Sequence, residues 1–319
     1  MSEPARGGFV YLGTSPFAVA ILELLAARGH RPALVVTPPD RRRGRGRSLS
    51  PAPAALAAEV LGIAVHKTES VNQPDSQAAI RQVGAAVAVV CAFGQLIKAP
   101  LLDELEILNV HPSLLPRWRG AAPIERALIA GDSETGVAII RLVAELDAGP
   151  IALCRHEPIA PEDNFETLQR RLALIGGELM GEALDRHAAG SLVLTPQDGA
   201  GIVYADKIDG SERFLDPARG AAELANRVRG LNPHLGTHLV VASQDGARLG
   251  VSVASVAIAE AGLEPGEIAV AEDGARLLLG CGEGSVLGIS RVKPAGSREM
   301  AVADYLRGRG APARATLGS

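Results

Sequence analysis

The feature that most constrains the fold of this chain is an apolar run, AAVAVVCAF, at residues 85–93. A strand that is continuously apolar has both faces covered, as is typical of parallel sheets with helices on each side. Other strand-sized apolar segments alternate with helix-sized ones between residues 9 and 111. We therefore expect a doubly wound, Rossmann-like and mostly parallel α/β sheet in the first part of the chain.

The expected elements of this first part follow from hydrophobic periodicity and from proline and glycine boundaries. Strands are predicted at residues 9–13, 33–37, 63–65, 85–93, 107–111, 136–142 and 152–158, and helices at 16–25, 53–61, 77–83, 100–104, 123–130 and 165–187. The last of these helices carries Leu168, Leu172, Ile175 and Leu179 on one face. This pattern predicts helices on both faces of one sheet.

The second part of the chain has a different pattern. Beyond a polar, proline- and glycine-containing stretch at residues 195–205, a helix at 220–229 precedes short apolar runs at 237–242, 247–258, 266–270, 275–280 and 285–292. Short strands at such spacing suggest a small β-barrel, and residues 308–319 are expected to fray. A chain of 319 residues suits two domains. We predict a catalytic domain over residues 1–190, a linker over 191–206 and a second domain over 207–319.

Composition restricts the class of protein. Hydrophobic residues make up 47% and charged residues 21% of the chain, as in ordinary globular proteins. No basic start followed by an apolar run and no membrane-length apolar segment is seen, so we expect a cytoplasmic protein. Cys91, Cys154 and Cys281 are scattered, which argues against a disulfide framework or a thiolate metal site, and no metal is expected.

Candidate catalytic residues cluster in the stretch from Leu108 to Gly149. Asn109 and His111 are two residues apart at the end of a predicted strand, so they project to the same side. The strand must end there because Pro112 follows. The carboxyl ends of strands in open α/β sheets are where ligands bind, and Asp147 lies in a loop after the next strand.

An amide, an imidazole and a carboxylate are suited to acyl transfer to an amine. Asn109 could donate a hydrogen bond to an oxyanion, His111 could exchange protons, and Asp147 could hold the imidazole in one tautomer. No serine or cysteine accompanies His111 in an elbow motif, which fits direct attack by a substrate amine. On spacing alone, a turn-stabilising role for Asn109 and His111 and a plain turn role for Asp147 remain open.

The runs NVHPSLLPRWRGAAPIERALIAGD and ELDAGPI resemble the signature of the folate-dependent formyltransferases, in the long form that acts on methionyl-tRNA. YLGTSPFAV, VTPPDRRRGRGRSLSP, VVCAFGQLI, YADKI, LNPHLGTH and VKPAGSREM follow in the family's order. The resemblance implies 10-formyltetrahydrofolate as donor, initiator Met-tRNA as acceptor and an OB-like second domain. It also implies catalytic roles for Asn109, His111 and Asp147. We also expect the protein to be a monomer.

The resemblance further implies where folate and tRNA bind. The folate pocket would be formed by the loop 92–96, the run 113–116 and the approach from Arg141 to Asp147, largely through backbone groups. Its candidate residues are Ala92, Phe93, Gly94, Leu96, Ser113, Leu114, Leu115, Pro116 and Val143. Between Val36 and Ser50 the chain has one acidic residue and five arginines: Arg41, Arg42, Arg43, Arg45 and Arg47. These arginines suit a solvated surface loop equally well. By resemblance they enter the acceptor stem of the tRNA, on a loop expected to be poorly ordered without RNA.

Three other functions remain open. The same site could formylate a small amine, such as an amino sugar nucleotide or glycinamide ribonucleotide, although the arginine loop and second domain argue against it. Water could act as the acceptor, giving hydrolysis of formyltetrahydrofolate. A catalytically silent RNA- or nucleotide-binding protein is disfavoured by the complete set of Asn109, His111 and Asp147. In the second domain, Lys207, Arg291, Lys293 and Arg298 are candidates for RNA contact.

Overall fold

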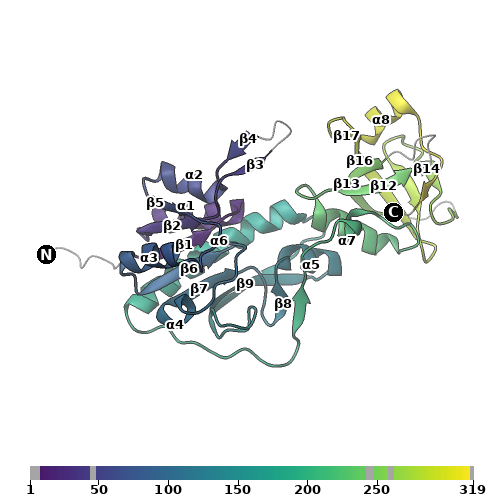
Figure 1. The fold of residues 1–319 in the computed structure, drawn as a ribbon. Helices are drawn as coiled ribbons and strands as arrows, with labels where there is room; N and C mark the ends of the chain where they lie inside the picture. The colour runs from purple at the N-terminus through teal and green to yellow at the C-terminus, as the bar shows by residue number, and fades with distance from the viewer. Residues whose placement is uncertain (1–7, 44–47, 242–247, 258–261, 317–319) are drawn as a thin grey trace. The chain divides into compact units, whose positions relative to one another are not determined.

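The computed structural model describes residues 8–43, 48–241, 248–257 and 262–316 (Figure 1). The chain forms two compact units. The first comprises residues up to 123, 134–158 and 169–205, and the second comprises 124–133, 159–168 and the residues from 206 onward. The predicted boundaries at residues 190 and 206 assign the segments 124–133 and 159–168 to the first domain, whereas their contacts group them with the second unit. The domain boundaries themselves stay a prediction.

The first unit is built on a seven-stranded sheet. Its strands, in the order in which they lie side by side, are β10 (Ile151–Pro158), β9 (Glu134–Arg141), β7 (Glu106–His111), β6 (Val87–Cys91), β1 (Val10–Gly13), β2 (Leu34–Thr37) and β5 (Ala64–Lys67). Adjacent strands from β7 to β5 are parallel, whereas β9 is antiparallel to both of its neighbours. The predicted mostly parallel α/β fold is confirmed.

Helices cover both faces of this sheet: α1 (Pro16–Ala27), α2 (Pro53–Val60), α3 (Pro74–Val83), α4 (Leu101–Glu104) and α6 (Phe165–Ala188). Pro16 occupies the first turn of α1, and Ser15 caps it by accepting a hydrogen bond from a backbone N–H. On one face α6 packs closely on α1, since a Cβ at Gly177 would lie 2.6 Å from Leu24. On the other face, α3 and α4 pack on the apolar side chains of β1, β2 and β6.

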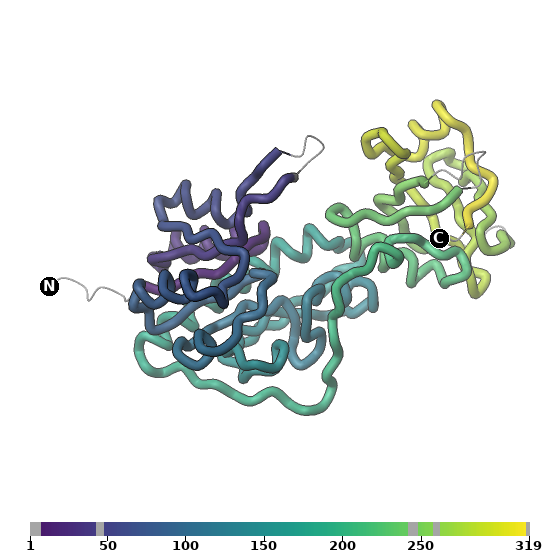
Figure 2. Tube along the Cα trace, in the orientation of Figure 1, coloured from purple at the N-terminus to yellow at the C-terminus, as the bar shows by residue number. Residues whose placement is uncertain are grey.

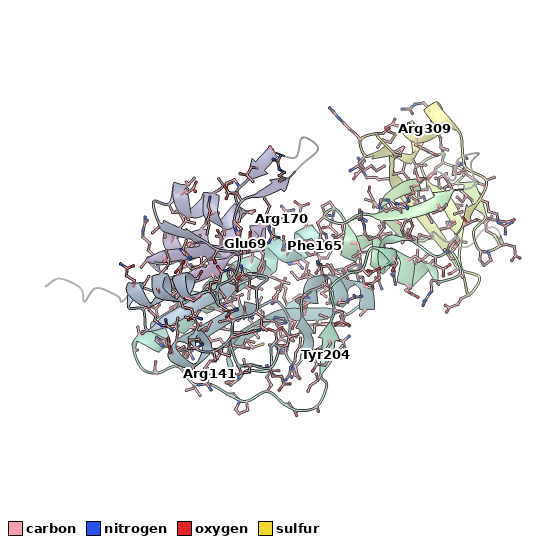
Figure 3. All side chains as sticks on the ribbon, viewed as in Figure 1. Glu69, Arg141, Phe165, Arg170, Tyr204 and Arg309 are labelled. Carbon is pink, nitrogen blue, oxygen red and sulfur yellow. The ribbon has the colours of Figure 1, made fainter. Side chains whose placement is uncertain are left out.

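Two small sheets lie outside this core. β3 (Arg41–Arg43) and β4 (Ser48–Ser50) form an antiparallel hairpin, and β8 (Arg117–Gly120) pairs in parallel with β11 (Val203–Ala205). Figure 2 shows that residues 189–205, which follow α6, run as an extended segment along the first unit before this pairing. Tyr204, labelled in Figure 3, is 53% exposed on β11. After α6 the chain therefore returns to β8, the short strand that follows β7 in the sequence.

The second unit contains an antiparallel sheet in the order β14 (Ile268–Val270), β15 (Leu277–Gly280), β16 (Val286–Pro294), β13 (Arg248–Ala257), β12 (Thr237–Val241) and β18 (Ala315–Thr316), with β17 (Met300–Ala301) paired to β16. A bridge between Glu267 and Arg314 joins the β18 end of the sheet to the β14 end. The sheet therefore closes into a barrel, as predicted. The expectation that residues 308–319 fray is wrong at 308–309, which end a helix, and at 315–316, because β18 pairs with β12.

The barrel is accompanied by α5 (Pro123–Ala130), a short 3₁₀ helix at Ser211–Arg213, α7 (Ala221–Leu231) and α8 (Val302–Arg309). Alternate side chains of its strands point inward and pack with Leu224, Val228 and Val302 of the helices. This second unit thus has a hydrophobic core of its own. Among the described residues, no helix is long and apolar enough to cross a membrane.

Candidate active site

A cavity of about 550 Å³ opens at the carboxyl ends of β6 and β7. It is lined by Phe17 and Val90, by residues 92–97 and Leu102, by residues 109–112, by Gly120, Ala121 and Pro123, and by residues 142–147. Asn109, His111 and Asp147 all lie in this lining. The structure thus brings together the three predicted catalytic residues, although Asp147 is distant from the other two in the sequence.

The strand β7 fixes Asn109 and His111 by its position inside the sheet. It lies between β6 and β9, and Asn109 is in register with Val90 on one side and with Ile140 on the other. Asn109 and His111 are 9% and 4% exposed. Because alternate residues of a strand share a face, both side chains reach the cavity from a rigid, buried element.

His111 is held in a defined tautomer. Its Nε2 atom is 2.8 Å from the carbonyl oxygen of Trp118. A carbonyl oxygen can only accept, so Nε2 carries the proton and donates it, and the neutral ring keeps its lone pair on Nδ1. Nδ1 lies 3.6 Å from Oδ2 of Asp147. The contact that selects the tautomer is therefore the Trp118 carbonyl, rather than Asp147 as expected.

Asp147 is fixed by a hydrogen bond of its own. The backbone N–H of Gly120 donates to Oδ2 of Asp147 at 2.8 Å. The carboxylate therefore stays beside the imidazole whether or not His111 is protonated. If Nδ1 takes up a proton, Asp147 stabilises the resulting imidazolium by charge attraction, since both side chains are almost fully buried.

Unusual backbone conformations concentrate at this site. Ala92, Trp118 and Asp147 have φ angles of 43°, 67° and 47°, and Glu283 is the one other non-glycine residue with positive φ in the described chain. Such angles are strained for residues with a Cβ and are found preferentially at functional sites. At Gly149 a Cβ would lie 1.7 Å from the carbonyl oxygen of Arg141, so the loop can close only over glycine.

The predicted folate contacts divide into two groups. Ala92, Phe93, Gly94, Leu96 and Val143 line the cavity, with Leu96 61% exposed at its mouth. The run of Ser113, Leu114, Leu115 and Pro116 does not line it: the Ser113 hydroxyl is buried and donates to the Arg117 carbonyl, and Leu115 packs behind β9. A folate-binding role for this second group stays a prediction.

Sequence reasoning missed two lining residues, Phe17 and Ile97. Leu142 and Leu146 fall within the predicted approach from Arg141 to Asp147 and line the cavity, with Leu146 53% exposed. Phe17 belongs to α1 and reads as ordinary core from its spacing. The lining is mostly apolar around a few polar groups, which is typical of sites for small ligands.

Of the predicted tRNA-binding arginines, Arg41, Arg42 and Arg43 form β3 and do not line this cavity. Arg41 and Arg42 are exposed, and the guanidinium of Arg41 is 4.0 Å from the carboxylate of Glu69. Arg45 and Arg47, the side chain of Arg43 and the expected mobility of residues 44–47 fall outside the described residues. Their contact with RNA stays a prediction.

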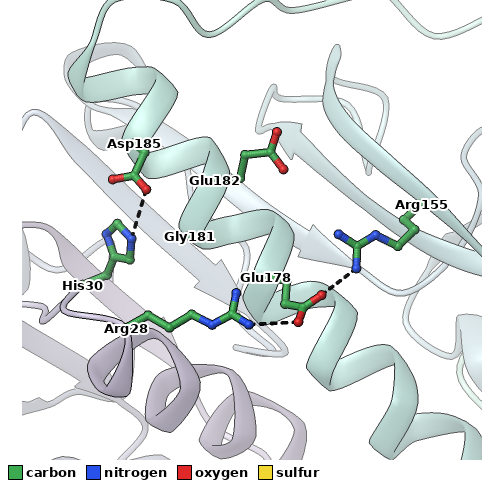
Figure 4. Close-up of a pocket in the computed structure, with 7 residues that line it drawn as sticks. All are labelled: Arg28, His30, Arg155, Glu178, Gly181, Glu182 and Asp185. Carbon is green, nitrogen blue, oxygen red and sulfur yellow. Dashed lines mark hydrogen bonds and ion pairs between the residues drawn. The ribbon is translucent and has the colours of Figure 1, made fainter.

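A second histidine–aspartate pair contrasts with the first. Nε2 of His30 lies 3.5 Å from Oδ2 of Asp185, and both residues line a cavity of about 540 Å³. Figure 4 shows this pair and its neighbours. Next to this pair, Glu178 accepts hydrogen bonds from Arg28 and Arg155, which lower the pKa of its carboxyl, Arg155 contributing more. The charges are partly exposed and paired, which is typical of surface ion-pair networks.

In the described part of the chain, no cluster of His, Cys, Asp and Glu is suited to a metal ion.

Comparison with known proteins agrees with the fold and the site. The formyl transferase family matches residues 8–184, and the formyl transferase C-terminal domain matches residues 207–310. The methionyl-tRNA formyltransferase of Methylobacterium sp. (strain 4-46) is 41% identical over 302 residues, covering 94% of this chain and 96% of that protein. That of Halorhodospira halophila is 40% identical over 307 residues, with the same coverage.

Solved structures support the same fold. HypX from Aquifex aeolicus, crystallised in complex with tetrahydrofolic acid, matches with a TM-score of 0.61 and 17% identity, covering 94% of this chain and 47% of that one. At that identity the likeness concerns the fold alone. The match of both family regions and the identity over almost the whole length together show that this chain belongs to the formyl transferase family, among the methionyl-tRNA formyltransferases.

Proposed function

We propose that this chain transfers the formyl group of 10-formyltetrahydrofolate to the amino group of the methionine on initiator Met-tRNA. The observation that carries the proposal is the convergence of Asn109, His111 and Asp147 in one largely apolar cavity. Its volume of about 550 Å³ lies within the range for small-molecule sites, and exposed apolar side chains at its mouth suit an aromatic cosubstrate. The named relatives act on methionyl-tRNA, which supports the acceptor.

In the proposed mechanism, Asn109 stabilises the negative charge that develops on the formyl oxygen when the amine nitrogen attacks the formyl carbon. Its side-chain amide has no hydrogen-bond partner among the described residues, so its N–H groups are available to the substrate. A donor fixed on a buried strand needs no reorganisation as charge develops. Preorganised donors of this kind usually make the largest single contribution to acyl transfer.

His111 carries the proton. Nδ1 is the ring nitrogen that holds the lone pair, so it accepts the proton that the attacking amine loses as the new C–N bond forms. Asp147 then faces an imidazolium across 3.6 Å. The same proton passes to N10 of the folate as its bond to the formyl carbon breaks. His111 returns to its neutral form, and no residue of the chain becomes covalently attached.

The arginines of the β3–β4 hairpin region supply the proposed contact with tRNA. Arg41, Arg42, Arg43, Arg45 and Arg47 are concentrated in a chain of net charge −4, so the positive field is local. A planar guanidinium binds phosphate and base edges through paired hydrogen bonds. We further propose that the protein acts as a monomer in the cytoplasm, where translation takes place.

Incubation with 10-formyltetrahydrofolate and charged Met-tRNA tests the proposal. We expect formyl-methionine on the initiator tRNA, much less on the elongator tRNA, and little hydrolysis of the donor without tRNA. His111→Ala should lower the rate by about 10³-fold, in the range that general acid–base groups contribute, and leave tRNA affinity nearly unchanged. A variant rate within tenfold of the parent protein would refute the role of His111. Formylation of small amines in place of tRNA would refute the acceptor.

A further inference from the structure

The loop that carries Asp147 is held from behind by a residue of the segment that leaves α6. The side-chain amide of Gln197 donates two hydrogen bonds, to the carbonyl oxygen of Asp147 at 2.7 Å and to that of Gly149 at 2.8 Å. Both hydrogens of the amide are thereby used. These bonds fix the backbone on either side of Ala148, within the loop where Asp147 has a positive φ.

Gln197 is held in turn by Arg119. Nε and Nη2 of Arg119 donate to Oε1 of Gln197 at 3.2 and 2.9 Å, and Nη1 donates to Glu145 of the same loop at 3.1 Å. Arg119 is only 4% exposed and does not line the substrate cavity. It borders a separate cavity of about 500 Å³ between the Asp147 loop and residues 196–202.

The backbone around Gln197 is anchored on both sides. Thr195 exchanges two backbone hydrogen bonds with Ile151, at 2.8 and 2.9 Å. Ala205 accepts hydrogen bonds from the N–H groups of Ala121 and Ala122, at 2.8 and 3.1 Å. The segment 195–205 is therefore part of the first unit, and Gln197 meets the loop from a fixed position.

Three successive residues connect these contacts to the catalytic side chains. The carbonyl of Trp118 accepts from His111, the guanidinium of Arg119 binds Gln197, and the N–H of Gly120 donates to Asp147. The side chain of Asp147 and its own backbone are thus tied to the same short strand, β8. A shift of the loop would change the distance between the carboxylate and the imidazole.

We propose that Gln197 and Arg119 are positioning residues of the formyl transfer reaction, and that the segment joining the two units completes the active site by clamping the Asp147 loop. This proposal rests on the proposed function. Gln197 supplies the two donors that hold the loop backbone, and Arg119 orients Gln197. Displacement of a catalytic group by about 1 Å through a distant change can cost about 10²-fold in rate, which sets the expected effect.

Two substitutions at Gln197 separate the clamp from general packing. Gln197→Glu keeps an acceptor for Arg119 but removes both donors to the loop, whereas Gln197→Leu removes every polar contact. We expect both to lower kcat by about 10²-fold, with the KM for 10-formyltetrahydrofolate within about threefold of the parent value. The matched control is Asp198→Asn, next to Gln197 and exposed, which should leave kcat unchanged.

Hydrogen exchange and a double-mutant cycle complete the test. In Gln197→Glu, amides of residues 142–149 should exchange faster while the strands of the sheet keep their protection. Adding Gln197→Glu to Asp147→Asn should lower kcat no further, because the clamp acts through Asp147. Any of three results would overturn the proposal: a wild-type kcat in Gln197→Glu, unchanged hydrogen exchange in the loop, or a double mutant whose kcat falls below that of Asp147→Asn by the full factor seen for Gln197→Glu alone. If the parent protein formylates no Met-tRNA, the proposed function fails, and the exchange measurement still tests the clamp.

Discussion

Replacing the carboxylate of Asp147 by an amide tests the proposed chemistry most directly. Oδ2 of Asp147 lies 3.6 Å from Nδ1 of His111, and the two side chains are 10% and 5% exposed. For unit charges at this separation, an effective dielectric constant of about 20 gives an attraction of about 5 kcal/mol between carboxylate and imidazolium. Since each 1.36 kcal/mol is a factor of about ten in rate, removing the charge should cost about 10³-fold.

Asp147→Asn removes the charge with little change of geometry. Oδ2 of Asp147 both accepts from the N–H of Gly120 and is the oxygen nearest Nδ1 of His111, so an amide oxygen in its place keeps the hydrogen bond and its position beside the imidazole. The neutral amide does not offset the charge of an imidazolium, so uptake of the proton from the amine becomes less favourable. We therefore expect kcat to fall by about 10³-fold while the KM values for folate and tRNA stay within about threefold.

The assay is formation of formyl-methionyl-tRNA from 10-formyltetrahydrofolate under initial-rate conditions. Asp185→Asn is a matched control, because His30 and Asp185 form a second histidine–aspartate pair at 3.5 Å that lies outside the cavity lining. It should leave kcat unchanged. A fall in kcat of less than tenfold in Asp147→Asn, or an equal fall in Asp185→Asn, would refute the proposal that the charge of Asp147 stabilises the transition state.

Two further predictions concern tRNA binding and stability. Replacing Arg41 and Arg42 with alanine should raise the KM for tRNA. The log–log slope of tRNA affinity against salt concentration should fall by about 0.9 for each phosphate that is no longer neutralised. A changed KM for folate with an unchanged KM for tRNA would count against the RNA-binding role. In the second unit, the hydrogen bonds from Arg126 lower the pKa of the Glu212 carboxyl below 4.5 against the effect of burial. The depressed pKa stabilises the folded state above pH 4.5, and this stabilisation is lost as the pH falls through the lowered pKa. Glu212→Gln should therefore lower Tm at neutral pH, and this loss should shrink as the pH falls below 4.5. A Tm loss that does not change with pH would contradict the ion pair.

The parts of the fold that follow a local rule were predictable from the sequence. Period-two alternation placed Asn109 and His111 on one side of β7, and the apolar run at residues 85–93 predicted the buried parallel strand β6. In contrast, β8 and β11 were not predicted, because RWRG and VYA are too short to show a strand pattern and RWRG is also charged. Their pairing depends on a return of the chain across more than eighty residues, which no local pattern encodes.

The same limit applies within the site. Residue types indicated an imidazole, an amide and a carboxylate, but the tautomer of His111 depends on a backbone carbonyl, and the loop of Asp147 depends on a glutamine in a segment that reads as a linker. Backbone acceptors leave no trace in residue identity. The predicted chemistry was therefore a set of possible roles, and only the geometry assigns the proton to a ring atom.

The strand β8 shows why so short a segment can organise this chemistry. Each of its last three residues acts through a different group: a carbonyl at Trp118, a guanidinium at Arg119 and an N–H at Gly120. Gly120 has a φ of 127°, and in this conformation its N–H points at Asp147. A Cβ at this position would lie 2.7 Å from the carbonyl oxygen of Ala205 on β11. Glycine at this position is thus required both by the close approach of β11 and by the conformation that aims its N–H at Asp147. Two of these contacts come from the backbone, so they survive changes of side chain at Trp118 as long as its positive φ is kept. Arg119 is the exception, since its contact with Gln197 depends on the guanidinium itself.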